Sequence, residues 1–142
     1  MIVDFYHLTA SPLERVLPSI AEKVVAGGER LLVVAEPDLL TRLDEILWSY
    51  SRDSFLPHGR DRPEVQPVLL SPEPEPKNGA INLALADGRW RDEALGFARA
   101  FYFFDNDARD SAREAWRALK GRPEVEARYW KQDERGKWVQ GP

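Results

Sequence analysis

Cationic side chains surround one tryptophan in the segment 109–120. On a helical wheel with Arg109 at zero, Trp116 falls at about −20° and Lys120 at about +20°. Arg113 and Arg117 fall at about +40° and about +80° on the same wheel. Arginine binds carboxylates in a forked geometry, and an indole ring adds apolar contact area. This face therefore suits an anionic ligand that also carries an apolar or aromatic group.

The same segment has a plainer interpretation as a solvated helix surface. Asp110 would then pair with Arg113, and Glu114 with Arg117, at the spacing of neighbouring residues on a helix. Exposed pairs of this kind contribute only about 0.2–0.5 kcal/mol each. They explain the charges but not the tryptophan, because the apolar residues of the helix form a separate stripe: Ala108, Ala112, Ala115 and Leu119.

Acidic residues that follow two apolar runs suggest a second kind of chemistry. Glu36 follows the first run, and Asp105 and Asp107 follow the second. Carboxylates at strand ends can hold Mg²⁺ for nucleotide or phosphate chemistry, and they also suit helix N-termini. A magnesium-dependent α/β enzyme that uses Glu36, Asp105 and Asp107 therefore stays open as the alternative function.

The sequence lacks the other common catalytic and cofactor motifs. Neither GxGxxG nor GxxxxGK[ST] occurs, and the turn 7–11 after the first apolar run contains no glycine. His7 and His58 are far apart and show no metal-ligand spacing. No cysteine is present to act as a nucleophile or as a thiolate ligand. We therefore expect no catalytic residues, no metal site, no cofactor and no intrinsic enzyme activity.

The elements that would position these residues alternate between strands and helices. Residues 2–7 and 30–35 predict buried strands, and a helix follows each: one to about residue 26, opened by a Ser11–Glu14 capping box, and one from Pro37. The pattern then predicts strands at 65–70, 81–85 and 96–104, a helical turn at 90–95, a long helix at 106–120, and a terminal strand or hairpin at 125–130 and 137–139.

Short connections between these elements favour a parallel sheet with right-handed crossovers. The predicted fold is a single α/β domain over residues 1–142, with a mostly parallel sheet and helices on both faces. It resembles a Rossmann-like nucleotide-binding fold without a phosphate loop.

Composition narrows the function classes further. The chain has 142 residues and a net charge of −4, so direct nucleic-acid binding is expected to be weak or absent. No apolar run approaches the roughly 20 residues that span a bilayer. The N-terminus has a strand pattern rather than that of a signal peptide. We therefore expect a cytoplasmic protein.

A second tryptophan lies off the core stripe of the helix that begins at Pro37. On the wheel, Trp48 falls about 140° from Leu43. Phe55 follows after a short turn, just before an extended Leu56–Pro57 step. The two aromatic residues could share one surface pocket, or they could form a satellite cluster that closes the helix end.

Two pieces of this region, RLDEILW at 42–48 and SFLPH at 54–58, resemble the signature region of the chi subunit family of bacterial DNA polymerase III holoenzyme. The length and the order of elements fit that family across nearly the whole chain. The resemblance implies a non-catalytic accessory subunit of a DNA-directed DNA polymerase, within the clamp-loader complex. It also implies binding to the acidic C-terminal tail of single-stranded DNA-binding protein. The family further contacts a small psi subunit, whose docking surface these residues do not locate.

When the family's positions are matched to this sequence, the resemblance implies that both aromatic segments bind the tail. Trp116 stands where a tyrosine is usual in the family, and Arg109 and Arg117 stand where lysines are. We therefore expect one continuous partner-binding surface that contains seven residues: Trp48, Phe55, Arg109, Arg113, Trp116, Arg117 and Lys120.

Overall fold

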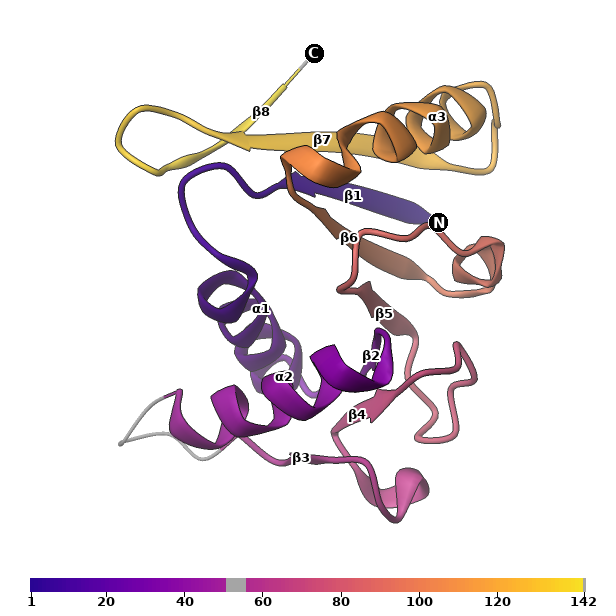
Figure 1. Cartoon of the computed structure of the whole chain (residues 1–142). Coiled ribbons are helices and arrows are strands. Elements are labelled where there is room, and N and C mark those ends of the chain that lie inside the picture. Colours follow the sequence, from indigo (N-terminus) through magenta and orange to yellow (C-terminus); the bar gives the residue numbers. More distant parts are fainter. Residues whose placement is uncertain (51–55, 142) are drawn as a thin grey trace.

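The computed structural model describes residues 1–50 and 56–141. Eight strands in this part of the chain form one sheet, in the order β3-β4-β2-β5-β6-β1-β7-β8 (Figure 1). Its neighbouring strands are parallel, apart from the antiparallel terminal pair β7 and β8. The strands are β1 (Ile2–His7), β2 (Leu31–Val34), β3 (His58–Gly59), β4 (Val68–Ser71), β5 (Asn82–Leu85), β6 (Arg99–Phe104), β7 (Glu126–Gln132) and β8 (Trp138–Gln140). The predicted α/β fold with a mostly parallel sheet is confirmed.

Helices connect the parallel strands. α1 (Leu13–Ala26) follows β1, α2 (Pro37–Ser49) follows β2, and α3 (Arg109–Lys120) follows β6. Short 3₁₀ helices are also present, and they are labelled η1 (Pro63–Val65), η2 (Asp92–Gly96) and η3 (Asn106–Ala108). Within the described ranges, no helix is long and apolar enough to cross a membrane.

The helices cover opposite faces of the sheet, as predicted. In β2, Leu31 and Val33 point to one face while Leu32 and Val34 point to the other, and all four are buried. α1 and α2 pack on the first face, and α3 packs on the second (Figure 1). This double burial explains why the strand reads as an unbroken apolar run.

The connection from β6 through α3 to β7 passes over β1. β1 therefore pairs with β6 on one side and with β7 on the other, with Asp4 opposite both Phe101 and Arg128. Residues near the two ends of the chain thus become neighbours, and they form the sheet surface beneath α3.

Local predictions differ from the structure in several places. Among them, the strand expected at 96–104 begins at Arg99, and the helix expected at 106–120 begins with the 3₁₀ helix Asn106–Ala108. The Ser11–Glu14 capping box is wrong, because Ser11 Oγ accepts a hydrogen bond from Gln132 Nε2 and Glu14 pairs with Arg42. The strand expected at 65–70 begins later, at β4, because η1 occupies its first residue and Pro67 offers no N–H to a ladder. The short strand β3 was not predicted, since two residues carry no readable period.

Candidate functional site

A pocket of about 410 Å³ opens between α3 and the strands β6, β1 and β7. α3 supplies Ala112 and two cations, Arg109 and Arg113, together with Trp116. The strands supply Phe5 and His7 from β1, Phe104 from β6, and Tyr129 and Lys131 from β7. The helix thus forms one wall of the pocket, and three sheet strands form the other.

Aromatic side chains make up the apolar part of the pocket. The Trp116 ring meets Phe5 edge to face, with centroids 5.2 Å apart and planes at 84°. It meets Tyr129 in the same manner, at 6.1 Å and 77°. Such edge-to-face pairs fix ring orientation beyond what area burial alone would do. Trp116 is therefore half-buried and anchored to the sheet, and it is not a free indole among the cations.

The cations of α3 form no ion pair with a carboxylate in the described part of the chain. Within residues 1–50 and 56–141, no ion pair within 4.0 Å involves Arg109, Arg113, Arg117 or Lys120. The salt bridges of the plainer interpretation, such as that of Arg113 with Asp110, are therefore not formed. Four positive charges stay available to an anion on one exposed helix face.

The cations differ in their position relative to the pocket. Arg109 and Arg113 line it, and Lys131 joins them from the strand side. Lys120 lies over the Trp116 ring, with Nζ 5.1 Å from the centroid, a cation–π contact. Arg117 is exposed and stands outside the pocket lining, which agrees with its place on the wheel at about +80°.

Hydrogen bonds of His7 link β1 to β7 and to η3 in the wall of the pocket. His7 Nε2 lies 2.8 Å from Asn106 Oδ1, and His7 Nδ1 lies 2.9 Å from the Tyr129 hydroxyl. Assigning Nε2 as the donor lets the Tyr129 hydroxyl donate to Nδ1. Burial raises the pKa of Tyr129, while Arg113 and Arg109 act in the opposite direction. Both arginines line the same pocket as the tyrosine.

The strand residues of this site were not predicted from the sequence. Tyr129 and Lys131 alternate with Arg128 and Trp130 along β7, so they share one face of the sheet. This alternation predicts a terminal strand, but it does not indicate that the strand lies beside β1. The pairing joins residues that are more than 120 positions apart, as in the His7–Tyr129 contact.

Trp48 lies away from this pocket, so the prediction of one continuous surface is wrong. Its helix, α2, packs through Leu43 and Leu47 on the opposite face of the sheet from α3. α2 also contacts β3 and β4, at the far end of the strand order from β7. The Trp48 side chain is 60% exposed and meets the His58 ring at 5.0 Å, which confirms that it lies off its helix's core stripe. Phe55 lies outside the described residues.

The acidic residues of the alternative function lie at another edge of the sheet. Glu36 and Asp105 line a cavity of about 700 Å³ at the carboxyl ends of the strands, but Asp107 does not. Asp105 accepts a hydrogen bond from the Ala108 N–H, which is the capping role. Among the described residues, no group of three or more acidic, histidine or cysteine side chains could hold a metal ion.

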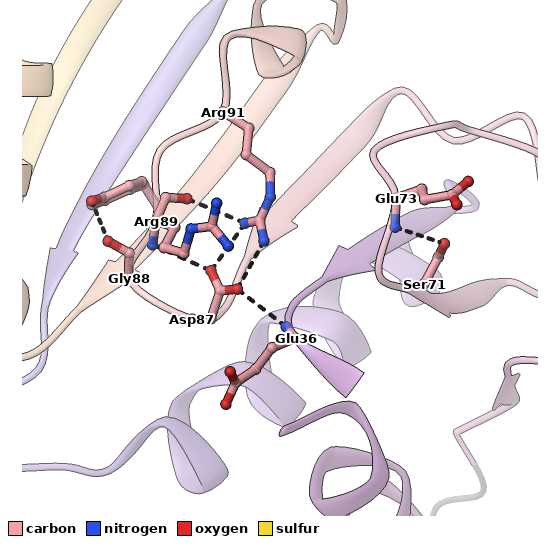
Figure 2. A network of polar contacts seen from close by, with 8 residues as sticks. Glu36, Ser71, Glu73, Asp87, Gly88, Arg89 and Arg91 are labelled. Carbon is pink, nitrogen blue, oxygen red and sulfur yellow. Dashed lines mark hydrogen bonds and ion pairs between the residues drawn. The ribbon is translucent and has the colours of Figure 1, made fainter. Parts of the chain in front are cut away.

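Asp87, a further carboxylate in the lining of this cavity, is paired with an arginine. Arg91 donates two hydrogen bonds to Asp87, at 2.9 and 2.8 Å. Burial raises the pKa of Asp87, but Arg91 outweighs it and the net pKa is lowered. Asp87 also accepts from the Glu36 backbone N–H, while the Glu36 side chain points away from it (Figure 2). The network thus orders the ends of β2 and β5 rather than gathering carboxylates around a cation.

Comparison with known proteins agrees with the resemblance of the signature region. The sequence model of the family described as DNA polymerase III chi subunit, HolC, matches residues 1–124. The chain therefore belongs to this family of accessory polymerase subunits. A search of curated proteins found no match. The family match covers α3 but ends before β7, so Tyr129 and Lys131 belong to the part of the site beyond it.

Proposed function

We propose that this member of the DNA polymerase III chi subunit family is a non-catalytic adaptor of the clamp-loader complex. Its pocket between α3 and β7 binds the acidic C-terminal tail of single-stranded DNA-binding protein. The observation that carries the proposal is a set of helix cations that form no ion pair among the described residues, beside an aromatic pocket. An acidic peptide that ends in an aromatic residue matches both features.

The pocket suits the terminal aromatic side chain. Trp116 contacts both Phe5 and Tyr129 edge to face, and these two contacts hold its ring in the wall of the pocket. A ring placed in the pocket against Trp116 or Tyr129 would add a further edge-to-face or offset contact. Fully desolvated aromatic anchors of this kind dominate the energy of many interfaces.

The cations suit the carboxylates that surround the aromatic residue. Arg109, Arg113 and Lys131 border the pocket and would engage the terminal carboxylate. Arg117 and Lys120 extend the basic surface toward the C-terminus of α3. The helix has 12 residues and is therefore about 18 Å long, which equals roughly five residues of extended peptide. Upstream acidic residues of the tail could thus follow the helix face.

Trp48 belongs to a second partner surface in this proposal. An adaptor must hold two partners at once, and an exposed indole on the opposite face of the sheet leaves the tail pocket unobstructed. We assign this surface to the clamp-loader side, through a psi subunit where one is present. Phe55 stays a predicted member of the same surface.

A calorimetric titration with an acidic peptide that ends in an aromatic residue tests the main proposal. Binding should be on the order of micromolar, about −8 kcal/mol. A scrambled peptide of identical composition, in which the aromatic residue is internal, should bind much more weakly. Equal affinity for both peptides would reject the pocket as a tail site.

A further inference from the structure

The opposite side of β1 and β7 carries a second aromatic and basic surface. A groove runs between α1 and the sheet, where two cavities of about 460 and 270 Å³ share Tyr6, Ile20 and Lys23. β1 and β7 point Tyr6 and Trp130 into this groove, whereas Phe5 and Tyr129 face α3. This groove shares no lining residue with the tail pocket.

Aromatic rings form the floor of the groove. Tyr6 stacks on Trp130 with centroids 6.3 Å apart and planes at 13°, and it meets Trp138 of β8 edge to face at 5.1 Å. All three side chains are partly exposed. Open indole and phenol rings on a sheet face are suitable platforms for planar ligands, because they lose little side-chain entropy on binding.

Cations border the floor on both sides. Arg15 and Lys23 line the groove from α1, and Arg99 lines it from β6. The two α1 cations are eight positions apart, which corresponds to about 12 Å along the helix. The groove is therefore locally basic in a chain whose net charge is −4.

The carboxylates near these cations offset part of the charge. Asp4 is fully buried and binds two arginines, Arg99 at 2.7 Å and Arg128 at 2.7 Å, and Arg128 also lies 3.8 Å from Glu126. This group is therefore close to neutral, and the basic character of the groove comes from Arg15 and Lys23. Trp130 Nε1 also donates to Asp4 at 2.9 Å, which fixes the indole on the floor. Glu29 lines the far end of the groove and accepts from Asn82.

We propose that this groove binds single-stranded nucleic acid, with bases stacked on Trp130, Trp138 or Tyr6 and phosphates paired with Lys23, Arg15 and Arg99. Charge complementarity to phosphate and exposed rings for sequence-independent stacking are the two recurring features of single-strand sites. An acidic peptide would satisfy the cations but would leave the rings without planar partners. The net charge of −4 lowers the affinity of the chain for nucleic acid, but it does not exclude a local binding site. The attraction is set by the charges within a screening length of about 10 Å.

The alternating pleat of the sheet makes the two sites compatible. Successive residues of β1 and β7 serve opposite faces, so a strand in this groove and a peptide under α3 would not collide. The protein could therefore hold a protein tail and the adjacent nucleic acid together. The nucleic-acid groove and the tail pocket share no lining residue. A result that excludes nucleic-acid binding would therefore not exclude binding of the acidic tail.

The test is tryptophan fluorescence quenching of the full chain by oligothymidylate of about 16 nucleotides, the upper end of common site sizes. Titrations run at low salt and are repeated as salt is raised. Lys23→Glu is compared with Arg117→Glu, since both residues are exposed cations in the last turn of their helices and the two changes in net charge are identical. Trp138→Ala reports on stacking, and circular dichroism checks that β8 stays folded.

Oligothymidylate should bind, and Lys23→Glu should raise Kd by at least about fivefold while Arg117→Glu changes it by less than about twofold. Trp138→Ala should weaken binding by a similar or larger factor. No binding at low salt, or equal loss in the Lys23 and Arg117 variants, would overturn the proposal. Binding of polyglutamate in place of the oligonucleotide would show that the groove is a peptide site and would overturn it as well.

Discussion

Trp116 on α3 and Tyr129 on β7 meet edge to face at 6.1 Å, and this contact joins the basic helix to the last long strand of the sheet. Trp116 lies within the family match, whereas Tyr129 lies beyond it. The pocket of this chain is therefore lined both by residues of the matched region and by residues of β7.

Trp116→Ala should weaken binding of the acidic peptide by about 2 kcal/mol, which is roughly 30-fold, because it removes an aromatic anchor. Isothermal titration calorimetry measures the loss. Since Trp116 also packs on Phe5, Trp116→Tyr serves as the conservative variant and should keep most of the affinity. If Ala and Tyr at this position bind equally well, Trp116 does not contact the peptide.

Arg113→Glu should cost at least about 2 kcal/mol of peptide affinity, since it places a negative charge at the border of the pocket. Arg135→Glu, on the exposed turn between β7 and β8, is the matched control with the same net charge. Affinity of the unchanged protein should also fall as salt rises above roughly 0.15 M, where the screening length is about 8 Å. A loss of the same size in the control would indicate a general charge effect.

Trp48→Ala should lower the free energy of unfolding by less than about 1 kcal/mol, because the side chain is 60% exposed. Urea denaturation followed by circular dichroism gives this value. The variant should bind the acidic peptide normally and should associate less well with the clamp-loader complex in a pull-down. A cost above about 3 kcal/mol would instead identify Trp48 as a core residue.

Asp4→Asn should destabilise the fold by about 2 kcal/mol at pH 7, because it removes charged hydrogen bonds from Arg99 and Arg128. Arg99 is 38% exposed, so solvent screens part of its interaction and the effect stays below that of a fully buried pair. Urea titrations of both proteins at pH 7 measure the difference.

The same residue gives a pH dependence of stability. Burial raises the pKa of Asp4, but hydrogen bonds from Arg128, Trp130 and Arg99 outweigh it, and the net pKa lies below 3.8. The folded state therefore binds the proton less tightly than the unfolded chain does. The stabilisation is fully present above the unfolded pKa and is lost as pH falls through the folded one. Between pH 5 and pH 2 the unchanged protein should thus lose more stability than Asp4→Asn, and parallel pH curves would contradict this.

Mg²⁺ with nucleotide should not raise the Tm, because Asp105 serves as a helix cap and Asp87 is paired with Arg91. Differential scanning fluorimetry provides the measurement, and a nucleotide hydrolysis assay accompanies it. Turnover that disappears in Asp105→Asn with Asp107→Asn would establish the alternative function instead.

The sequence by itself determined the features that depend on local geometry. Helical spacing placed Arg109, Arg113, Trp116 and Lys120 on one face, because a helix fixes the angle between residues whatever surrounds it. Unbroken apolar runs such as 30–35 identified strands buried on both faces, and their alternation with helices indicated a parallel sheet. The order of elements followed from these periods.

The tertiary structure decided which of these elements became neighbours. No local period states that β7 pairs with β1, because such pairing reflects the packing of the whole sheet. His7, Tyr129 and Lys131 therefore entered the site only through the fold. The same applies to Trp48: a helical wheel shows that it leaves its own core stripe, but the face of the sheet that its helix covers depends on the direction of the crossover. α2 and α3 cover opposite faces, so two aromatic segments that the sequence joined into one surface became two.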